Sequence, residues 1–178
     1  MAVITFSGLH GAGKSTYAKK IAEEFGLRYL SAGEIFRLIA NERGLTIIEL
    51  TDLAASDSSI DRQMDDRTRY EAERGSVVLD GQLTGWIAGD LADIKIYLKA
   101  PLDVRVARLA SRDGVSLEEA REELLHREAA EKKRYKGLYG IDVDDTSIYE
   151  VILDTSILGS ESMKRILKTI VEEYVSTQ

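Results

Sequence analysis

The stretch Gly8–Ser15 (GLHGAGKS) decides the fold of this chain, because it joins two elements with different hydrophobic patterns. Before it, Ala2–Ser7 is short, apolar and rich in β-branched residues, which is typical of a buried parallel strand. After it, Lys14–Phe25 carries apolar side chains at helical spacing, and Gly26 marks the end of the helix. A glycine-rich turn between a strand and a helix, closed by lysine and serine, has the pattern of a P-loop.

The chemistry of this loop is anion binding. Glycines at positions 8, 11 and 13 allow the backbone to curl, so that successive N–H groups point at one phosphate. The following helix adds its positive dipole end, Lys14 is expected to reach the outer phosphates, and the Ser15 hydroxyl is expected to ligate Mg²⁺. His10 is expected to contribute its backbone rather than its imidazole. The predicted phosphate-binding residues are Gly8, Leu9, His10, Gly11, Ala12, Gly13, Lys14, Ser15 and Thr16.

Composition limits the partners of the chain. With 178 residues and 44% hydrophobic content, the chain fits one domain with a real core. A net charge of -7 argues against a nucleic-acid polymer as partner, although a local group of arginines can still hold small anions. The absence of cysteine excludes disulfides and thiolate metal sites. No membrane span or signal peptide is recognisable, so we expect a cytoplasmic protein, and we expect a monomer.

The rest of the chain alternates short apolar runs with amphipathic segments. Further strands are predicted at residues 27–30, 77–79, 93–98 and 149–153, and helices at 32–41, within 45–75, from 116 to about 138, and at 162–175. This alternation predicts a three-layer α/β/α fold with a five-stranded parallel sheet. The site of such a fold lies at the carboxyl ends of the strands. There the sequence places Ser7-Gly8, Ser31, Asp80-Gly81 and Asp154-Thr155.

A P-loop indicates phosphate binding but not a reaction. GTPases usually carry an Asn-Lys-x-Asp segment for guanine, and the only asparagine of this chain is Asn41. A motor ATPase would usually place an acidic pair after an apolar strand and would need more residues to couple hydrolysis to motion. A small kinase remains.

Five segments then indicate a family, namely the P-loop and the residues at 31–37 (SAGEIFR), 60–67, 80–86 (DGQLTGW) and 127–142. In these segments the chain resembles the nucleoside monophosphate kinases, and most closely the short archaeal-type cytidylate kinases. The resemblance implies a P-loop kinase fold over residues 1–178, with an acceptor-binding helical insertion at about 31–75 and a lid at about 108–134. It also implies Mg²⁺-assisted, in-line transfer of the ATP γ-phosphoryl group to CMP, and to dCMP.

The resemblance also suggests which residues hold the acceptor. Arg37 corresponds to the arginine that grips the acceptor monophosphate, although it could be a solvated helix charge. Asp80 could hold Mg²⁺ through water or orient the acceptor. Gln82 departs from the family, whose members commonly carry arginine there, and an amide cannot neutralise phosphate. Ser31 could contact the base or simply cap a helix. The full set is Ser31, Gly33, Arg37, Arg67, Asp80, Gly81 and Gln82.

The predicted lid contributes further arginines. Arg108 and Arg112 stand four residues apart on one helix face and resemble the arginines that cover ATP, with Arg105 a weaker candidate that could face solvent. Arg127 and Arg134 resemble those of the returning lid arm, which approach the transferring group, so they join Lys14 as catalytic candidates. Ordinary i,i+4 ion pairs, Glu123 with Arg127 and Glu128 with Lys132, are the alternative.

Two other functions remain open at this point. The acceptor could be UMP, AMP or a small molecule other than a nucleotide, because the sequence does not show how the base is recognised. A regulatory protein that binds nucleotides without turnover is a hypothesis of another class. Gln82 favours that second hypothesis, and the lid arginines argue against it.

Overall fold

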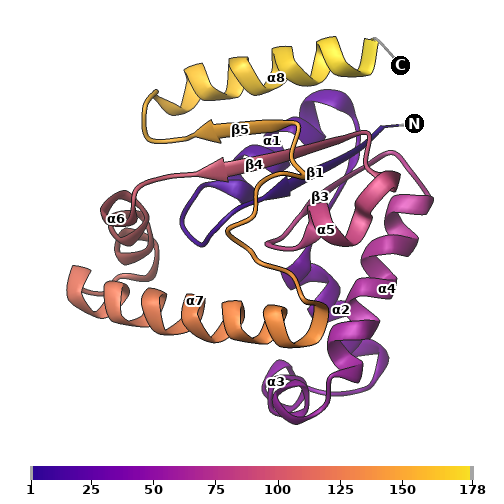
Figure 1. Cartoon of the computed structure of the whole chain (residues 1–178), viewed down its shortest axis with the longest axis vertical. Helices are drawn as coiled ribbons and strands as arrows, with labels where there is room; N and C mark the ends of the chain where they lie inside the picture. Colours follow the sequence, from indigo (N-terminus) through magenta and orange to yellow (C-terminus); the bar gives the residue numbers. More distant parts are fainter. Residues whose placement is uncertain (1, 177–178) are drawn as a thin grey trace.

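A single parallel sheet forms the centre of the computed structural model, which describes residues 2–176 except the side chains at 51, 55, 56 and 176. Its strands are β1 (Val3–Ser7), β2 (Arg28–Ser31), β3 (Val77–Asp80), β4 (Ile94–Lys99) and β5 (Val151–Asp154). They lie in the order β2-β3-β1-β4-β5, and every neighbouring pair is parallel (Figure 1). The predicted five-stranded parallel sheet is therefore confirmed. Because β1 is central, the loop that follows it leaves the middle of the carboxyl edge.

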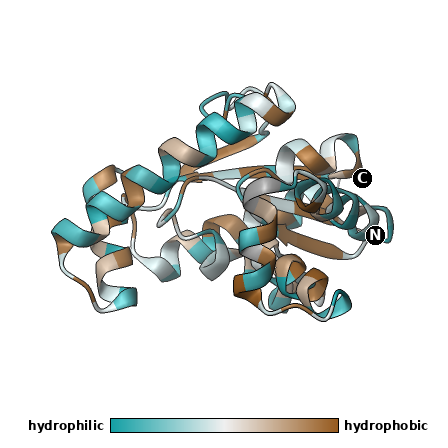
Figure 2. Ribbon diagram, turned by 90° about the horizontal axis from the view of Figure 1, so that it is seen from below, coloured by the Kyte–Doolittle hydropathy of each residue, from teal (hydrophilic) through white to brown (hydrophobic). Residues whose placement is uncertain are grey.

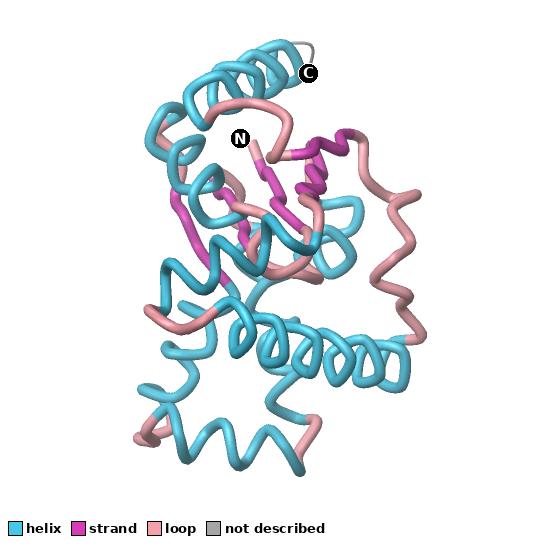
Figure 3. Tube along the Cα trace, turned by 90° about the vertical axis from the view of Figure 1, so that its left-hand side faces the viewer, coloured by secondary structure: helices cyan, strands magenta, loops and turns pink. Residues whose placement is uncertain are grey.

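Helices cover both faces of this sheet (Figures 1 and 3). They are α1 (Lys14–Phe25), α2 (Ala32–Glu42), α3 (Ile47–Ser56), α4 (Ser59–Glu73), α5 (Thr84–Ala88), α6 (Leu102–Asp113), α7 (Leu117–Tyr139) and α8 (Ser160–Ser176), with a short 3₁₀ helix at Gly89–Leu91. Helices α1 and α8 pack on one face of the sheet, and α4 and α5 pack on the other. None of the helices in residues 2–176 is both long and apolar enough to cross a bilayer.

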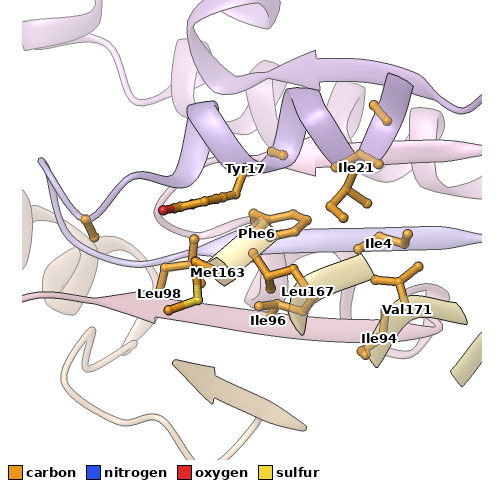
Figure 4. Packing of buried hydrophobic residues seen from close by; sticks show 14 residues of the cluster. Ile4, Phe6, Tyr17, Ile21, Ile94, Ile96, Leu98, Met163, Leu167 and Val171 are labelled. Atoms are coloured by element: carbon orange, nitrogen blue, oxygen red, sulfur yellow. The ribbon is translucent and has the colours of Figure 1, made fainter. Parts of the chain in front are cut away.

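The alternation of side chains along the strands explains this layering. On β1, Ile4 and Phe6 face α1 and α8, whereas Val3 faces α4 and α5. Figure 4 shows the larger cluster, in which Phe6 lies among residues of β4, α1 and α8. Leu167 of α8 is fully buried there. Full burial of a leucine contributes about 2 kcal/mol, so α8 is an integral part of the core.

The region between β2 and β3 forms a separate helical group. Buried Ile35, Ile39, Leu50 and Ile60 join α2, α3 and α4 in a side-chain cluster of their own. The helical region expected within residues 45–75 consists of two helices, α3 and α4.

Capping explains this division. A capping box begins α3, where the Thr46 hydroxyl accepts a 3.2 Å hydrogen bond from the N–H of Glu49. Between the helices, a carboxylate oxygen of Asp57 accepts a 2.8 Å hydrogen bond from the N–H of Ser59. The capping boxes expected at Ser31 and Ser116 are both present.

Helices α6 and α7 form a hairpin with a small cluster of its own, made by Val106, Ala110, Ala120 and Leu124. Beyond that cluster α7 is largely exposed, and its ribbon is mostly teal in Figure 2. Residues 140–150 then run back to β5 as an extended loop (Figure 3). The hairpin therefore touches the sheet domain through few apolar contacts, and its attachment depends on polar side chains.

Candidate active site

The P-loop is tightly enclosed at its back. Gly8, Gly11 and Gly13 all have positive φ angles, of 135°, 77° and 93°. A Cβ at Gly8 would lie 2.0 Å from the carbonyl oxygen of Leu98, and one at Gly11 would lie 2.8 Å from that of Arg105. Glycine is therefore required both for backbone conformation and for the close approach of β4 and α6.

A cleft of about 1030 Å³ opens in front of this loop, at the carboxyl edge of the sheet. The predicted site residues that line it are His10, Gly11, Gly13, Lys14, Ser15, Thr16, Ser31, Gly33, Arg37, Asp80, Gly81, Gln82, Arg108, Arg112, Arg127 and Arg134. Gly8, Leu9 and Ala12 belong to the loop but do not line the cleft, and Ala12 is fully buried.

The structure places Arg67 outside this cleft. Its Nε donates to Glu71 at 3.1 Å, and its Nη1 lies 3.4 Å from Glu42. It borders a smaller hollow of about 340 Å³ between α2 and α4, together with Tyr70. The physical reason is the buried carboxylate of Glu71, which is 5% exposed and which recruits the cations one turn away along α4.

Lys14 lies at the bottom of the cleft, where its Nζ donates to the carbonyl oxygen of Leu9 at 3.0 Å. Burial lowers the pKa of Lys14, while the carboxylates of Asp80 and Glu131 raise it in part. A cation with this much lost hydration gains strongly from a phosphate ligand. The site is thus electrostatically prepared for an anion.

Asp80 ends β3 and is held by a neighbouring strand. The Tyr29 hydroxyl donates a 2.7 Å hydrogen bond to Oδ2 of Asp80, which is 3% exposed. Burial and the adjacent Asp80 carboxylate raise the pKa of Tyr29, so this phenol remains a donor. The bond fixes the carboxylate but leaves its Oδ1 for another ligand.

The donor set of the cleft fits Mg²⁺. Ser15 and Asp80 both line it, offering one hydroxyl and one carboxylate. Within the part of the chain that the structure describes, no group of three or more His, Cys, Asp or Glu side chains could enclose a metal. Mg²⁺ keeps several waters and is usually held by one or two side chains together with substrate phosphates. A cage made only of protein ligands is therefore not needed.

Two arginines tie α6 to the P-loop. Arg108 donates from Nη1 to the carbonyl oxygen of Gly11 at 3.1 Å and from Nη2 to that of Thr155 at 2.9 Å. Arg105 is only 6% exposed and donates from Nη1 to the carbonyl oxygen of His10 at 3.0 Å. The suggestion that Arg105 faces solvent is therefore wrong. Arg112, by contrast, is largely exposed and pairs with Asp113 at 2.7 Å.

The imidazole of His10 also contacts another part of the site, Glu131 of α7. Its Nε2 lies 2.6 Å from Oε2 of Glu131 on α7, so the expectation that only the His10 backbone contributes is wrong. The Nε of Arg127 donates to the other oxygen, Oε1, at 3.0 Å. Burial raises the pKa of Glu131, but the charges and hydrogen bonds of His10 and Arg127 outweigh it, so this pKa lies below its usual value. Glu131 is therefore an ionised carboxylate beside the phosphate loop.

The i,i+4 pairs offered as an alternative explanation of the lid charges do not match these contacts. Arg127 pairs with Glu131 rather than Glu123, and Glu128 pairs with Arg105 at 2.5 Å rather than with Lys132. Arg127 therefore still pairs along α7 at i,i+4 spacing, whereas Glu128 takes its partner from α6.

The opposite end of the cleft has a different character. Phe36, Ala54, Ile60 and Met64 supply an apolar wall from α2, α3 and α4. Beside it Asp61, 7% exposed, lies 3.1 Å from Nη2 of Arg134 of α7. An apolar wall with a charged edge suits a flat polar ring. In the sequence Asp61 belongs to the family segment 60–67, but an acidic residue on a charged helix gives no signal of its role.

Two of the predicted acceptor residues show specific local roles. The Ser31 hydroxyl accepts a 3.1 Å hydrogen bond from the N–H of Glu34 and so caps α2. The side-chain oxygen Oε1 of Gln82 is buried without a hydrogen-bond partner among the described residues. A buried amide oxygen of this kind is costly unless a ligand satisfies it. Among the predicted site residues, Gln82 is therefore the one with a buried side-chain oxygen that lacks a hydrogen-bond partner in the described part of the chain.

Solved structures share this architecture. A shikimate kinase from Bacteroides thetaiotaomicron superposes with a TM-score of 0.66 at 16% identity, covering 96% of this chain and 98% of that one. A shikimate kinase from Acinetobacter baumannii gives a TM-score of 0.63 at 18% identity, covering 97% and 94%. At such low identity these similarities establish the fold alone, which is that of P-loop kinases.

Sequence comparisons are more specific. A protein named cytidylate kinase from Staphylothermus marinus is 49% identical over 175 residues, which cover 98% of this chain and 99% of that protein. Another of that name from Pyrococcus horikoshii is 45% identical over 170 residues, covering 96% and 88%. The model of the cytidylate kinase-like family matches residues 3–157. This chain belongs to the cytidylate kinase-like family.

Proposed function

We propose that this chain transfers the γ-phosphoryl group of ATP to CMP, and to dCMP, with Mg²⁺. The observation that carries the proposal is a single cleft lined by cationic side chains from both the P-loop and α2. One end is the P-loop with Lys14, and the other contains Arg37 beside the apolar wall of α2, α3 and α4. Relatives named cytidylate kinase that align over nearly the whole chain support the same acceptor.

The reaction needs little covalent work from the protein. An oxygen of the acceptor phosphate forms a bond to the γ-phosphorus, and the bond between that phosphorus and the β–γ bridging oxygen breaks, giving ADP and CDP. The protein must align two anions and offset their charge. We assign charge compensation at the transferring group to Lys14, Arg127 and Arg134, since all three line the cleft. Arginine suits this task because its planar fork binds phosphate oxygens in pairs.

The donor half consists of the loop from Gly8 to Thr16 together with two arginines of α6. Backbone N–H groups of the loop bind the phosphates, with Gly8, Leu9 and Ala12 supporting the loop from behind. Arg108 and Arg112 cover the nucleotide from the side. Ser15 and, through water, Asp80 would hold Mg²⁺, which neutralises phosphate charge when bound.

The acceptor half lies against α2 and α4. Arg37 binds the acceptor phosphate, and Ser31, Gly33, Gly81 and Gln82 border it. The apolar wall receives the base. The exposed edge of cytosine presents an amino donor next to acceptors. Asp61 matches the donor.

The organisation of the domain follows from these two halves. We propose that the helical region at about 31–75 serves the acceptor and that the region at about 108–134 acts as a lid that excludes water. Their separate apolar clusters support this division. We further propose a monomer as the active unit.

A coupled assay of ADP release with CMP, dCMP, UMP and AMP as acceptors tests the proposal. We expect the highest kcat/KM with CMP or dCMP. We expect Lys14→Ala to abolish transfer while the protein stays folded, and Lys133→Ala, an exposed change on α7, to leave it intact. Preference for AMP or UMP would overturn the acceptor assignment. Binding of ATP with no transfer to any acceptor would instead support a regulatory protein.

A further inference from the structure

Polar side chains of the α6–α7 hairpin hold one residue of the P-loop, His10. From α6, Arg105 donates to the His10 carbonyl oxygen at 3.0 Å. From α7, Glu128 accepts from Arg105 at 2.5 Å, and Glu131 contacts the His10 ring at 2.6 Å. Arg105, Glu128 and Glu131 are all largely buried, with side chains 7%, 15% and 17% exposed. Ion pairs shielded in this way are screened less by salt than exposed ones.

Glu131 differs from Glu128 in having two side-chain partners among the described residues, because its two carboxylate oxygens contact two different residues of the cleft. Oε2 contacts Nε2 of His10, and Oε1 accepts from Nε of Arg127. Since Glu131 is ionised, the Nε2 of His10 must carry the proton and donate it. The carboxylate thus bridges the loop that binds the donor phosphates and an arginine that lines the same cleft.

The bond to Glu131 leaves the two terminal nitrogens of Arg127 available for a phosphate. A guanidinium has five N–H donors, and the bond to Glu131 uses only the one on Nε. The fork formed by Nη1 and Nη2 remains for a phosphate. The Arg127 side chain is 55% exposed, so without the carboxylate little else would restrict its rotamers.

Charge explains why the bridge is more than a surface ion pair. A carboxylate beside the P-loop repels nucleotide phosphates unless cations compensate it. Docking of the α6–α7 hairpin on the P-loop does not require the Glu131 carboxylate, because Arg105 and Glu128 already join the hairpin to His10. The Glu131 carboxylate therefore carries an electrostatic cost beside the bound phosphates that docking of the lid does not explain.

We propose that Glu131 is a positioning residue for Arg127 and that His10 anchors Glu131 to the P-loop. In this arrangement the loop that binds the donor also sets the orientation of the arginine that meets the transferring phosphoryl group. The proposal rests on the proposed function, because it assigns the orientation of a group that acts only during transfer.

A double-mutant cycle tests it. We expect Glu131→Ala to lower kcat up to about 100-fold, the cost of a misplaced catalytic group, with a change in KM below about 3-fold. Arg127→Ala should lower kcat at least as much. In the Arg127→Ala background, Glu131→Ala should have almost no further effect, since a positioning residue has nothing left to position. Glu122→Ala, which removes a charge from an exposed site of the same helix, is the matched control and should leave kcat unchanged.

The anchor is tested by rescue. His10→Ala should lower kcat, whereas His10→Gln, whose amide can still donate to Glu131, should recover most of it. The inference would be overturned by additive effects in the cycle or by an effect on KM alone. It would also be overturned by an unaffected Arg127→Ala variant, or by equal loss of kcat in both His10 variants. Circular dichroism of every variant separates these results from misfolding. If the unsubstituted protein transfers no phosphoryl group to CMP, the proposed function fails first, and that result is distinct from all the others.

Discussion

Arg134 of α7 and Asp61 of α4 form an ion pair of 3.1 Å that joins the two sides of the cleft. Asp61 is 7% exposed and stands at the apolar end, where the acceptor base is proposed to bind. A buried carboxylate there can accept from an amino group but repels a carbonyl oxygen. The pair therefore offers a physical basis for discriminating cytosine from uracil, which carries an oxygen where cytosine carries the amino group.

Asp61→Asn tests this role. The amide can donate to the uracil oxygen, so we expect kcat/KM for CMP to fall about 10- to 100-fold, the value of one charged hydrogen bond, and that for UMP to rise. Asp65→Asn is the matched control, because Asp65 lies one turn further along α4, interacts with Tyr139 and does not line the cleft. An unchanged ratio of CMP to UMP in Asp61→Asn would remove Asp61 from base recognition.

Tyr29→Phe tests the support of Asp80. Loss of the hydroxyl removes the 2.7 Å bond that fixes the carboxylate, so the carboxylate is less well placed for metal-bound water. We expect the Mg²⁺ concentration for half-maximal activity to rise about 10-fold, as is usual when a group behind a metal ligand is lost. Titration of activity with Mg²⁺ measures it. Tyr70→Phe, an exposed change on α4, should leave the titration unaltered.

Lys14→Met is expected to stabilise the ligand-free protein while abolishing catalysis. Burial lowers the pKa of Lys14 below its value of about 10.5 in the unfolded chain, so folding requires a costly desolvation of the charge. At pH 7 the substitution should raise the free energy of unfolding by about 1 kcal/mol, which is typical where function opposes stability.

The sign of the pH dependence follows from the direction of that pKa shift. Between the lowered pKa and about 10.5, the unfolded chain binds one more proton than the folded chain, so stability rises with pH. The advantage of Lys14→Met should therefore shrink from pH 7 toward pH 10. Urea unfolding at several pH values measures it, with the exposed Lys133→Met as control. A constant advantage would contradict the buried-charge explanation.

Comparison of Gly11→Ala with Gly26→Ala separates the two reasons why Gly11 must be glycine, which are its positive φ angle and the close approach of α6. Gly11 and Gly26 both have positive φ, of 77° and 60°. A Cβ at Gly11 would lie 2.8 Å from the carbonyl oxygen of Arg105, whereas one at Gly26 would meet nothing within 4 Å. We expect Gly26→Ala to cost about 1–2 kcal/mol of stability, from backbone conformation alone, with normal kcat.

Gly11→Ala should add a steric cost that Gly26→Ala lacks. The new methyl group pushes α6 away from the loop, so we expect ATP affinity to fall about 10-fold or more because the phosphate-binding N–H groups are displaced. Calorimetric titration with ATP and urea unfolding of both variants measure the two costs. Equal binding of ATP by both variants would show that α6 can shift without consequence.

The fold was largely predictable because its signals are local. Strand–loop–helix order around Gly8–Ser15, capping boxes at Ser31 and Ser116 and short apolar runs indicate the elements and their alternation. The strand order β2-β3-β1-β4-β5 depends on contacts between distant segments. The start of α3 within residues 45–75 also has a local signal, Thr46 with Glu49 three residues later. A capping box depends only on hydrogen bonds between side chains and backbone groups three residues apart in sequence.

The contacts of the site were less predictable, because they depend on which helix faces which. The sequence places Arg105 on a helix but does not show that the His10 carbonyl lies opposite it. Likewise, Arg67 belongs to a family segment, yet the buried Glu71 one turn away holds it outside the cleft. A charged residue takes the partner that tertiary packing supplies, and sequence spacing reports only the neighbours along its own helix.

The apolar cluster that joins α2, α3 and α4 is separate from the cluster beneath the P-loop. Substitutions in the wall proposed to receive the base are therefore expected to leave the packing around Lys14 undisturbed. A lineage can change its phosphate acceptor by altering these three helices while it keeps the ATP-binding apparatus intact. The same independence offers a route to engineered acceptor preference, in which α2–α4 are redesigned on an unchanged sheet.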